Sequence, residues 1–249
     1  MMTLALITAC IVPPRTNLAV NGSQGGGQKG PGGGPASVAR PLLTVDETGS
    51  TQVESAQLAA VLDTMTLGEL SAEESAALTY MREEEKLAHD VYVTLGEQWQ
   101  LPIFTNIAGS ETTHTEAIKT LLDRYGLADP VAGNGVGVFT DATLQGLYDQ
   151  LVADGAQSLA AALTVGATIE DLDIVDLEQR IAQTDNADIK LVFSNLMQGS
   201  RNHLRAFVST LERQTGERYQ PQYLDQTAYD AIISSDMERG GRGQGRGQR

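Results

Sequence analysis

The feature that most constrains the fold is a set of four long segments in which apolar residues recur at steps of three and four. This spacing places apolar side chains along one face of an α-helix, whereas the alternation typical of strands is almost absent. The segments are expected at about Ser71–Trp99, Ile103–Tyr125, Ser158–Gln183 and Asn186–Gln214. We therefore predict an all-α fold whose four long helices form two hairpins joined by a longer connection, as in a four-helix bundle with short extra helices.

Local signals mark where these helices begin and end. Ser71 and Glu74 have the spacing of a capping box, in which each side chain accepts a hydrogen bond from the backbone of the other. Gly126 and Gly216 follow the second and fourth segments, and glycine is the favoured residue directly after a helix. Three shorter helices are expected at about Glu54–Met65, Asp141–Ala153 and Thr227–Ser234.

Polar residues interrupt each apolar stripe near its middle. They are Glu85 in the first helix, Glu111 and His114 in the second, Glu170 and the nearby Asp173 in the third, and Ser200 and His203 in the fourth. Each has an ordinary explanation when taken singly, such as a glutamate that reaches solvent or a hydrogen-bonded core histidine. Together, three carboxylates and two histidines at one depth would leave buried charges uncompensated, and a bound divalent or trivalent cation would neutralise them. We therefore predict a metal site in the core.

Four sequence segments extend this pattern: EEEKLAHDVY at 83–92, FTNIAGSETTH at 104–114, ATIE at 167–170 and GSRNHLRAF at 199–207. Their order resembles the ferritin-like superfamily, in which each of two hairpins contributes a Glu from its first helix and a Glu-x-x-His pair from its second. Over roughly Leu78–Ile233 the chain resembles more closely the ferritin-like family catalogued as domain of unknown function 2202. The seven-residue step from Glu85 to Tyr92 also resembles rubrerythrins and favours Glu85 over its glutamate neighbours.

The resemblance implies a set of metal ligands, namely Glu85, Glu111, His114, Glu170 and His203. The three glutamates would bridge or chelate the metal, and the histidines would be terminal nitrogen ligands. Ser200 stands where the superfamily has a second Glu before its histidine, so one metal position lacks an oxygen. Asp173 or His89 could compensate, since each lies within one helical turn of a proposed ligand. Otherwise the site would hold one ion, or hold the second weakly.

Carboxylates and imidazoles suit iron, manganese or zinc, and the resemblance favours iron, as a di-iron or mono-iron centre. It implies redox chemistry with oxygen or peroxide, with a small oxidant or an electron donor as partner, so that the protein would be a di-iron oxidoreductase. The alternative is a non-catalytic, metal-stabilised binding module on the cell surface. Ser200 favours this alternative, and so does Cys10, the single cysteine, because an attached cysteine-ligated iron centre cannot form within this chain. Iron storage, a third function, would require assembly into a cage.

The two ends differ in composition from the helical part. Ile7-Thr8-Ala9-Cys10 resembles the lipobox of bacterial lipoproteins, so we expect residues 1–10 to be a lipoprotein signal segment and Cys10 to be lipidated. Residues 11–50 would form a Gly-rich tether, residues 51–236 the helical domain and residues 237–249 an Arg/Gly-rich tail. The expected location is extracytoplasmic, with membrane attachment through Cys10. A cytoplasmic protein with a chance apolar N-terminus is the alternative.

The net charge of the helical part limits the classes of molecule that it is expected to bind. Three of the 17 basic residues precede Pro41 and four follow Glu238, so the segment between them carries 10 basic and 32 acidic residues, a net charge of −22. Such a surface repels nucleic acid and attracts cations. We therefore expect metal ions as partners and no nucleic acid bound to the core, with a homodimer as the candidate assembly.

Overall fold

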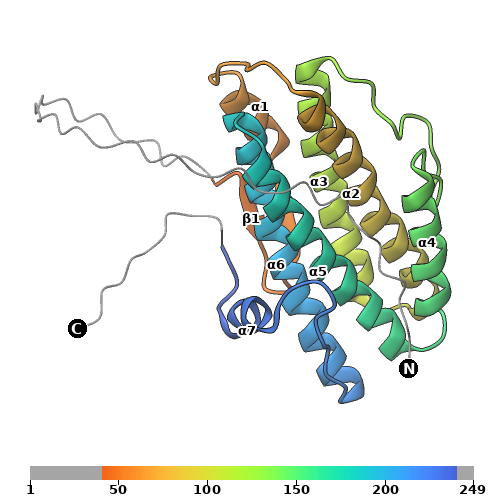
Figure 1. Cartoon of the computed structure of the whole chain (residues 1–249). Coiled ribbons are helices and arrows are strands. Elements are labelled where there is room, and N and C mark those ends of the chain that lie inside the picture. Colours follow the sequence, from red (N-terminus) through yellow and green to blue (C-terminus); the bar gives the residue numbers. More distant parts are fainter. Residues whose placement is uncertain (1–40, 240–249) are drawn as a thin grey trace, which may run out of the picture. The chain divides into compact units, whose positions relative to one another are not determined.

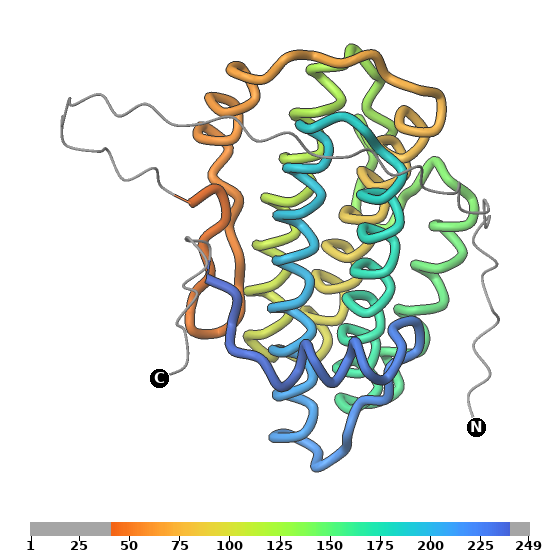
Figure 2. Tube along the Cα trace, turned by 60° about the vertical axis from the view of Figure 1, so that its left-hand side comes forward, coloured from red at the N-terminus to blue at the C-terminus, as the bar shows by residue number. Residues whose placement is uncertain are grey.

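The structure, a computed structural model, describes residues 41–239, which are all-α apart from one short β-hairpin (Figure 1). The long helices are α2 (Ala72–Trp99), α3 (Pro102–Tyr125), α5 (Leu159–Gln183) and α6 (Ala187–Thr215). Helix α2 packs against α3 and helix α5 packs against α6, and the two pairs lie side by side in both views (Figures 1 and 2). The expected all-α fold is thereby confirmed.

Shorter elements cover these helices. Strands β1 (Leu43–Val45) and β2 (Thr51–Val53) pair antiparallel and form the N-terminal hairpin, residues 43–53, followed by α1 (Ser55–Leu62). The hairpin packs against α3 and α6, whereas α4 (Ala142–Gly155) packs against α2 and α5 (Figure 2). Helix α7 (Gln226–Ser234) lies against α6. The hairpin and α4 thus cover different pairs of long helices.

Ser71, Gly126 and Gly216 act as predicted at the ends of their helices. The Ser71 hydroxyl accepts a hydrogen bond from the backbone N–H of Glu74 at 3.1 Å, and the Glu74 carboxylate accepts one from the N–H of Ser71 at 2.9 Å. Gly126 and Gly216 end α3 and α6 with φ of 67° and 76°, a left-handed conformation that glycine adopts without strain. Asn186 precedes α6, but its side chain donates to Glu69 and Glu74 and does not cap the helix.

A polar layer divides the core into two apolar clusters. One cluster includes Ala88, Ala108 and Phe207, and the other includes Met81 and Leu196. Along the four long helices, the buried polar side chains between these clusters are those of Glu85, Glu111, His114, Glu170, Asp173, Ser200 and His203. The helices therefore bring the polar interruptions of their stripes to a common depth.

The predicted domain boundaries need correction at both ends. The tether was expected to reach residue 50, but Leu43 is 1% exposed and pairs with Val53 across the hairpin. At the other end, the Glu238 carboxylate accepts hydrogen bonds from Arg201 at 2.7 Å and Arg205 at 2.8 Å. A strand of three residues is too short to show a periodic pattern of apolar residues, and a single anchoring residue such as Glu238 shows no pattern at all. The sequence therefore did not reveal either boundary.

Three of the predicted segments fall largely or wholly beyond the described part of the chain. The expected signal segment with Cys10, the tether up to residue 40 and the tail from residue 240 lie outside the described residues. Within residues 41–239, no helix combines the length and the apolar character needed to span a membrane.

Candidate metal centre

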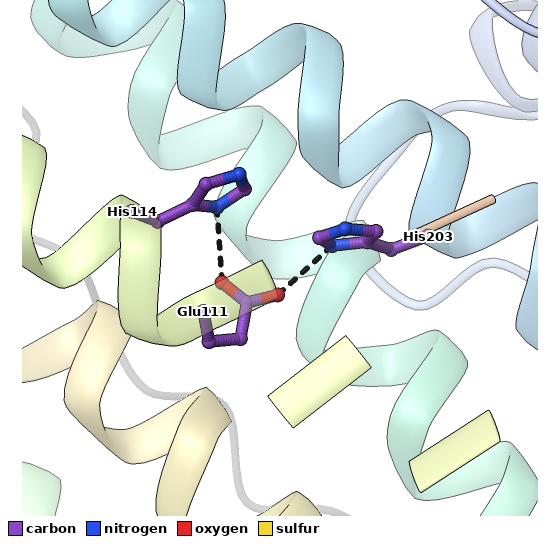
Figure 3. Close-up of side chains that lie close together, drawn as sticks. All are labelled: Glu111, His114 and His203. Atoms are coloured by element: carbon purple, nitrogen blue, oxygen red, sulfur yellow. Dashed lines mark ion pairs between the residues drawn. The ribbon is translucent and has the colours of Figure 1, made fainter. Parts of the chain in front are cut away.

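Two helices from different hairpins place an acidic side chain between two imidazoles (Figure 3). Glu111 and His114 lie one turn apart on α3, and His203 projects from α6. The Glu111 carboxylate contacts both rings, with Oε2 3.0 Å from Nδ1 of His114 and Oε1 2.9 Å from Nδ1 of His203. One ligand-type atom from each of the three residues lies within 4.8 Å of the others. These three residues could therefore hold a metal ion together.

A second carboxylate flanks each imidazole. Glu85 Oε2 on α2 lies 3.3 Å from Nδ1 of His114, and Glu170 Oε2 on α5 lies 3.4 Å from Nδ1 of His203. The two halves therefore match, with one flanking glutamate and one histidine from each hairpin around the central Glu111. The Tyr92 hydroxyl donates a hydrogen bond to Glu170 Oε1 at 2.6 Å and fixes that carboxylate. All five of these acidic and imidazole side chains are at most 2% exposed.

Several polar atoms of this cluster lack a hydrogen bond of acceptable geometry despite their close neighbours. They include both Nδ1 atoms and one carboxylate oxygen each of Glu85 and Glu111. Buried polar atoms are nearly always satisfied, and each orphan costs roughly 1–3 kcal/mol. Lone pairs that converge without bonding one another fit a cation between them. The residues present therefore fit a metal ion by their chemistry and by their arrangement.

The electrostatics of the cluster follow from its burial. Burial alone would lower the pKa of both histidines, but the adjacent carboxylates raise it, to about 9 for His203 and well above its ordinary value for His114. Burial works against the ionised form of Glu111, but the two imidazoles hold its pKa below the ordinary value. Burial raises the pKa of Glu85 to about 7. Without metal, the adjacent carboxylates therefore favour the protonated form of both histidines.

Asp173 lies beside Ser200 in the same buried layer. The Ser200 hydroxyl donates a hydrogen bond to Oδ2 of Asp173, while Oδ1 has no partner. Burial raises the pKa of Asp173 well above its ordinary value, and the negative charge of Glu85 adds to this effect. The structure thus places a carboxylate from α5 next to Ser200 and in the field of Glu85.

The structure places the other candidates elsewhere. His89 Nδ1 lies 2.8 Å from Asp90 Oδ1, and its ring lines a cavity of about 280 Å³ together with Arg82 and Lys86. Of the neighbouring glutamates, Glu83 accepts hydrogen bonds from the backbone N–H groups just before α4. Glu84 is buried, whereas Glu85 contacts the imidazole of His114.

Sequence reasoning missed one residue that touches both histidines. Thr51 of β2 is hydrogen-bonded through its hydroxyl to Nε2 of His114 and to Nε2 of His203. Its short strand lies in the segment expected to join the tether to the first helix, and a lone threonine there carries no metal-ligand signal. Only the tertiary packing of the hairpin on α3 and α6 reveals its place.

The chain is similar to a described protein family, to another protein by sequence, and to a solved structure. The sequence model of a family described as "Uncharacterized protein domain (DUF2202)" matches residues 74–236. A protein of Methanocaldococcus jannaschii, "Uncharacterized protein MJ0754", is 55% identical over 171 residues, which cover 69% of this chain and 92% of the relative. A crystal structure of hypothetical protein MJ0754 from Methanococcus jannaschii matches with a TM-score of 0.69 and 52% identity, over 70% of this chain and 99% of that one.

Proposed function

This chain belongs to the uncharacterized DUF2202 domain family, and we propose that it binds metal in its helical core through Glu111, His114 and His203. The observation that carries this proposal is the pair of buried Nδ1 atoms that face one carboxylate without forming a hydrogen bond of acceptable geometry. Glu85 and Glu170 complete the proposed ligand set, each beside one imidazole.

Iron is the metal we assign, with manganese and zinc as the alternatives that the same donors accept. The order of the donors supports iron, because a Glu on the first helix and a Glu-x-x-His pair on the second is the arrangement of ferritin-like di-iron proteins. A second ion would take its oxygen ligands from Asp173, which lies next to Ser200. We therefore propose a centre of two ions, in which Asp173 replaces the glutamate that Ser200 displaces.

Iron held in this position would supply redox chemistry with oxygen or peroxide. The residues of the chain then have separate tasks. Tyr92 orients Glu170 through its hydrogen bond, and the two apolar clusters keep bulk water from the buried donors. Glu85 would hold the ion beside His114. We accordingly propose that the protein is an oxidoreductase. We also propose that it lies outside the cytoplasm and is attached to the membrane through a lipidated Cys10.

A non-catalytic, metal-stabilised module is the second candidate. The observation that favours it is Ser200, since a hydroxyl bonded to Asp173 is a poorer iron ligand than a glutamate. In this case the ion would raise the melting temperature but would not cycle between oxidation states. The two candidates differ in redox turnover and share the same ligands.

Elemental analysis of the full chain, purified without chelator, tests the proposal when it is combined with absorption spectra. We expect about two irons per chain, with an absorption band that bleaches on reduction and returns on addition of peroxide. One zinc per chain with no redox response would support the module. Absence of any metal, with no uptake of Fe²⁺, Mn²⁺ or Zn²⁺ on addition, would contradict both candidates.

A further inference from the structure

One hydroxyl group closes the side of the metal centre that faces away from the carboxylates. Thr51 Oγ1 lies 3.0 Å from Nε2 of His114 and 2.9 Å from Nε2 of His203. The two rings are stacked with an interplanar angle of 21° and a centroid separation of 5.3 Å, so their Nε2 atoms converge on the same oxygen. Thr51 is 4% exposed. It therefore contacts both proposed nitrogen ligands at the atom that does not face the metal position.

A hydrogen bond to Nε2 determines how an imidazole can bind metal. An imidazole that binds metal through Nδ1 carries its proton on Nε2, and the partner of that N–H fixes both the tautomer and the orientation of the ring. A hydroxyl oxygen has two lone pairs and can accept from two N–H donors at once. Thr51 can thus hold both rings in the form that leaves each Nδ1 lone pair free for metal.

The surrounding backbone is arranged to hold this threonine in place. The N–H of Thr51 donates to the hydroxyl of Ser110 at 2.8 Å, and the N–H of Val53 donates to the hydroxyl of Thr113 at 3.0 Å. Both acceptors lie on the stretch of α3 that carries Glu111 and His114. Strand β2 is therefore fastened directly to the helix that supplies two of the proposed ligands.

Gly199 on α6 provides the space for this arrangement. A Cβ atom at this position would lie 2.5 Å from Cε1 of His114 and 3.3 Å from Oγ1 of Thr51. Any side chain larger than hydrogen would displace the imidazole or the hydroxyl. The absence of a side chain therefore lets α6 approach the contact between Thr51 and His114.

We propose that Thr51 is a positioning residue of the metal centre, which orients His114 and His203 through their Nε2 atoms. This inference rests on the proposed function and deepens it. It also extends the functional unit, because the N-terminal hairpin lies outside residues 74–236, the segment that the family model matches. A hairpin outside that segment would thus contribute to how tightly the core holds its metal.

The test compares three single variants of the full chain. Thr51→Val removes the hydroxyl at nearly constant volume, and Thr51→Ser restores it. Thr113→Val is the matched control, because it removes a hairpin-docking bond without removing a contact to either imidazole. Two quantities are measured: the affinity and visible spectrum of bound Co²⁺, and the Nε2–H proton shifts of ¹⁵N-histidine-labelled, metal-free protein.

We expect Thr51→Val to weaken Co²⁺ binding by about 10- to 100-fold and to change the Co²⁺ spectrum, as loss of a partner of a ligand histidine does. Thr51→Ser should restore both, and Thr113→Val should lose much less Co²⁺ affinity than Thr51→Val, because it leaves both imidazole contacts in place. Equal Co²⁺ affinity in Thr51→Val and the wild type would overturn the inference. Equal losses in Thr51→Val and Thr113→Val would also overturn it, because hairpin docking would then be the cause.

The proton shifts separate this inference from the proposed function. If even the wild type binds no Co²⁺, the metal proposal fails, and the Nε2–H shifts alone decide the role of Thr51. Shifts that move for both histidines in Thr51→Val and return in Thr51→Ser would support the positioning of the rings. Unchanged shifts would overturn it. If Thr51→Val does not fold, the wild-type shifts decide, since two hydrogen-bonded Nε2–H protons are required.

Discussion

The Oε1 atom of Glu111 on α3 lies 2.9 Å from Nδ1 of His203 on α6, so a single carboxylate joins the two helical hairpins at their centre. The other oxygen of this carboxylate faces His114 at 3.0 Å. Helices α3 and α6 are thereby coupled through polar groups that are buried in an otherwise apolar interior. The arrangement explains why the polar layer is a candidate for function: it lowers the stability of a simple bundle unless a cation neutralises it.

Glu111→Gln is the sharpest substitution at the centre. It keeps the shape of the side chain and removes the charge between the imidazoles, so we expect the affinity for metal to fall by more than about 100-fold, beyond the effect of an outer-sphere change. Glu116→Gln, on the exposed face of the same helix, is the control and should bind normally. Dialysis against a competing chelator measures both. Full retention of metal in the double variant Glu111→Ala with His203→Ala would rule out this site.

Metal binding should depend strongly on pH. The pKa of His203 in the metal-free protein is raised to about 9, so a proton competes with the metal below that pH. We expect the apparent affinity to rise by up to about tenfold per pH unit for each displaced proton, and the contribution of His203 to level off above about pH 9. Titration calorimetry in buffers of different ionisation enthalpy measures the protons released. Affinity that is flat between pH 6 and 9 would contradict the protonation state inferred for the histidines.

The stability of the metal-free protein should change in the opposite direction. A histidine with a raised pKa stabilises the fold below its unfolded value of about 6.5, and this contribution is lost as pH rises through about 9. The melting temperature of the metal-free protein should therefore fall as the pH rises from 6.5 to 9, whereas that of the metal-loaded protein should not. A midpoint that rises from pH 6.5 to pH 9 in the absence of metal would contradict this expectation.

Asp173→Asn tests whether one acidic residue replaces the missing glutamate. If Asp173 supplies oxygen to the second ion, the variant should retain one ion per chain where the wild type holds two. Glu178→Gln, an exposed position on the same helix, should leave the count unchanged. Metal counting by mass spectrometry distinguishes them. If Asp173→Asn still holds two ions, Asp173 is not a ligand, and another residue supplies the oxygen to the second ion.

Gly199→Ala and Gly109→Ala form a matched pair. Both glycines lie inside long helices, where alanine is favoured by about 1 kcal/mol, and a Cβ at Gly109 meets nothing within 4 Å. A Cβ at Gly199 would lie 2.5 Å from His114, which cannot move freely between Glu85, Glu111 and Thr51. We expect Gly109→Ala to raise the melting temperature and Gly199→Ala to lower the free energy of unfolding by about 1–3 kcal/mol. A Gly199→Ala variant as stable as Gly109→Ala would contradict the packing described.

The sequence predicts the helices and the common depth of the polar residues well, for a physical reason. Both depend on spacing along single helices, and steps of three and four place Glu111 and His114 on one face wherever the helix lies. The capping box of Ser71 and Glu74 is likewise a local signal, and the structure contains it. Properties carried by neighbours in the chain can be read directly from the order of residues.

Contacts between distant segments are less accessible. His89 and Glu85 are separated by about one helical turn, yet the contact with Asp90 and the cavity beside Arg82 place His89 away from the imidazoles. Thr51 meets the histidines because a hairpin of two three-residue strands docks on α3 and α6. Neither outcome has a periodic signature, since both depend on how separate elements pack.

Anomalous X-ray diffraction from crystals of the full chain, purified without chelator, tests the central claim most directly. Data collected on both sides of the iron absorption edge, and of the manganese and zinc edges, identify the element and its position together. We predict an iron peak between the Glu111 carboxylate and the Nδ1 atoms of His114 and His203, with a second peak beside Asp173. A map without a peak at these atoms, from crystals grown with added Fe²⁺, would contradict the claim that this polar layer is a metal centre.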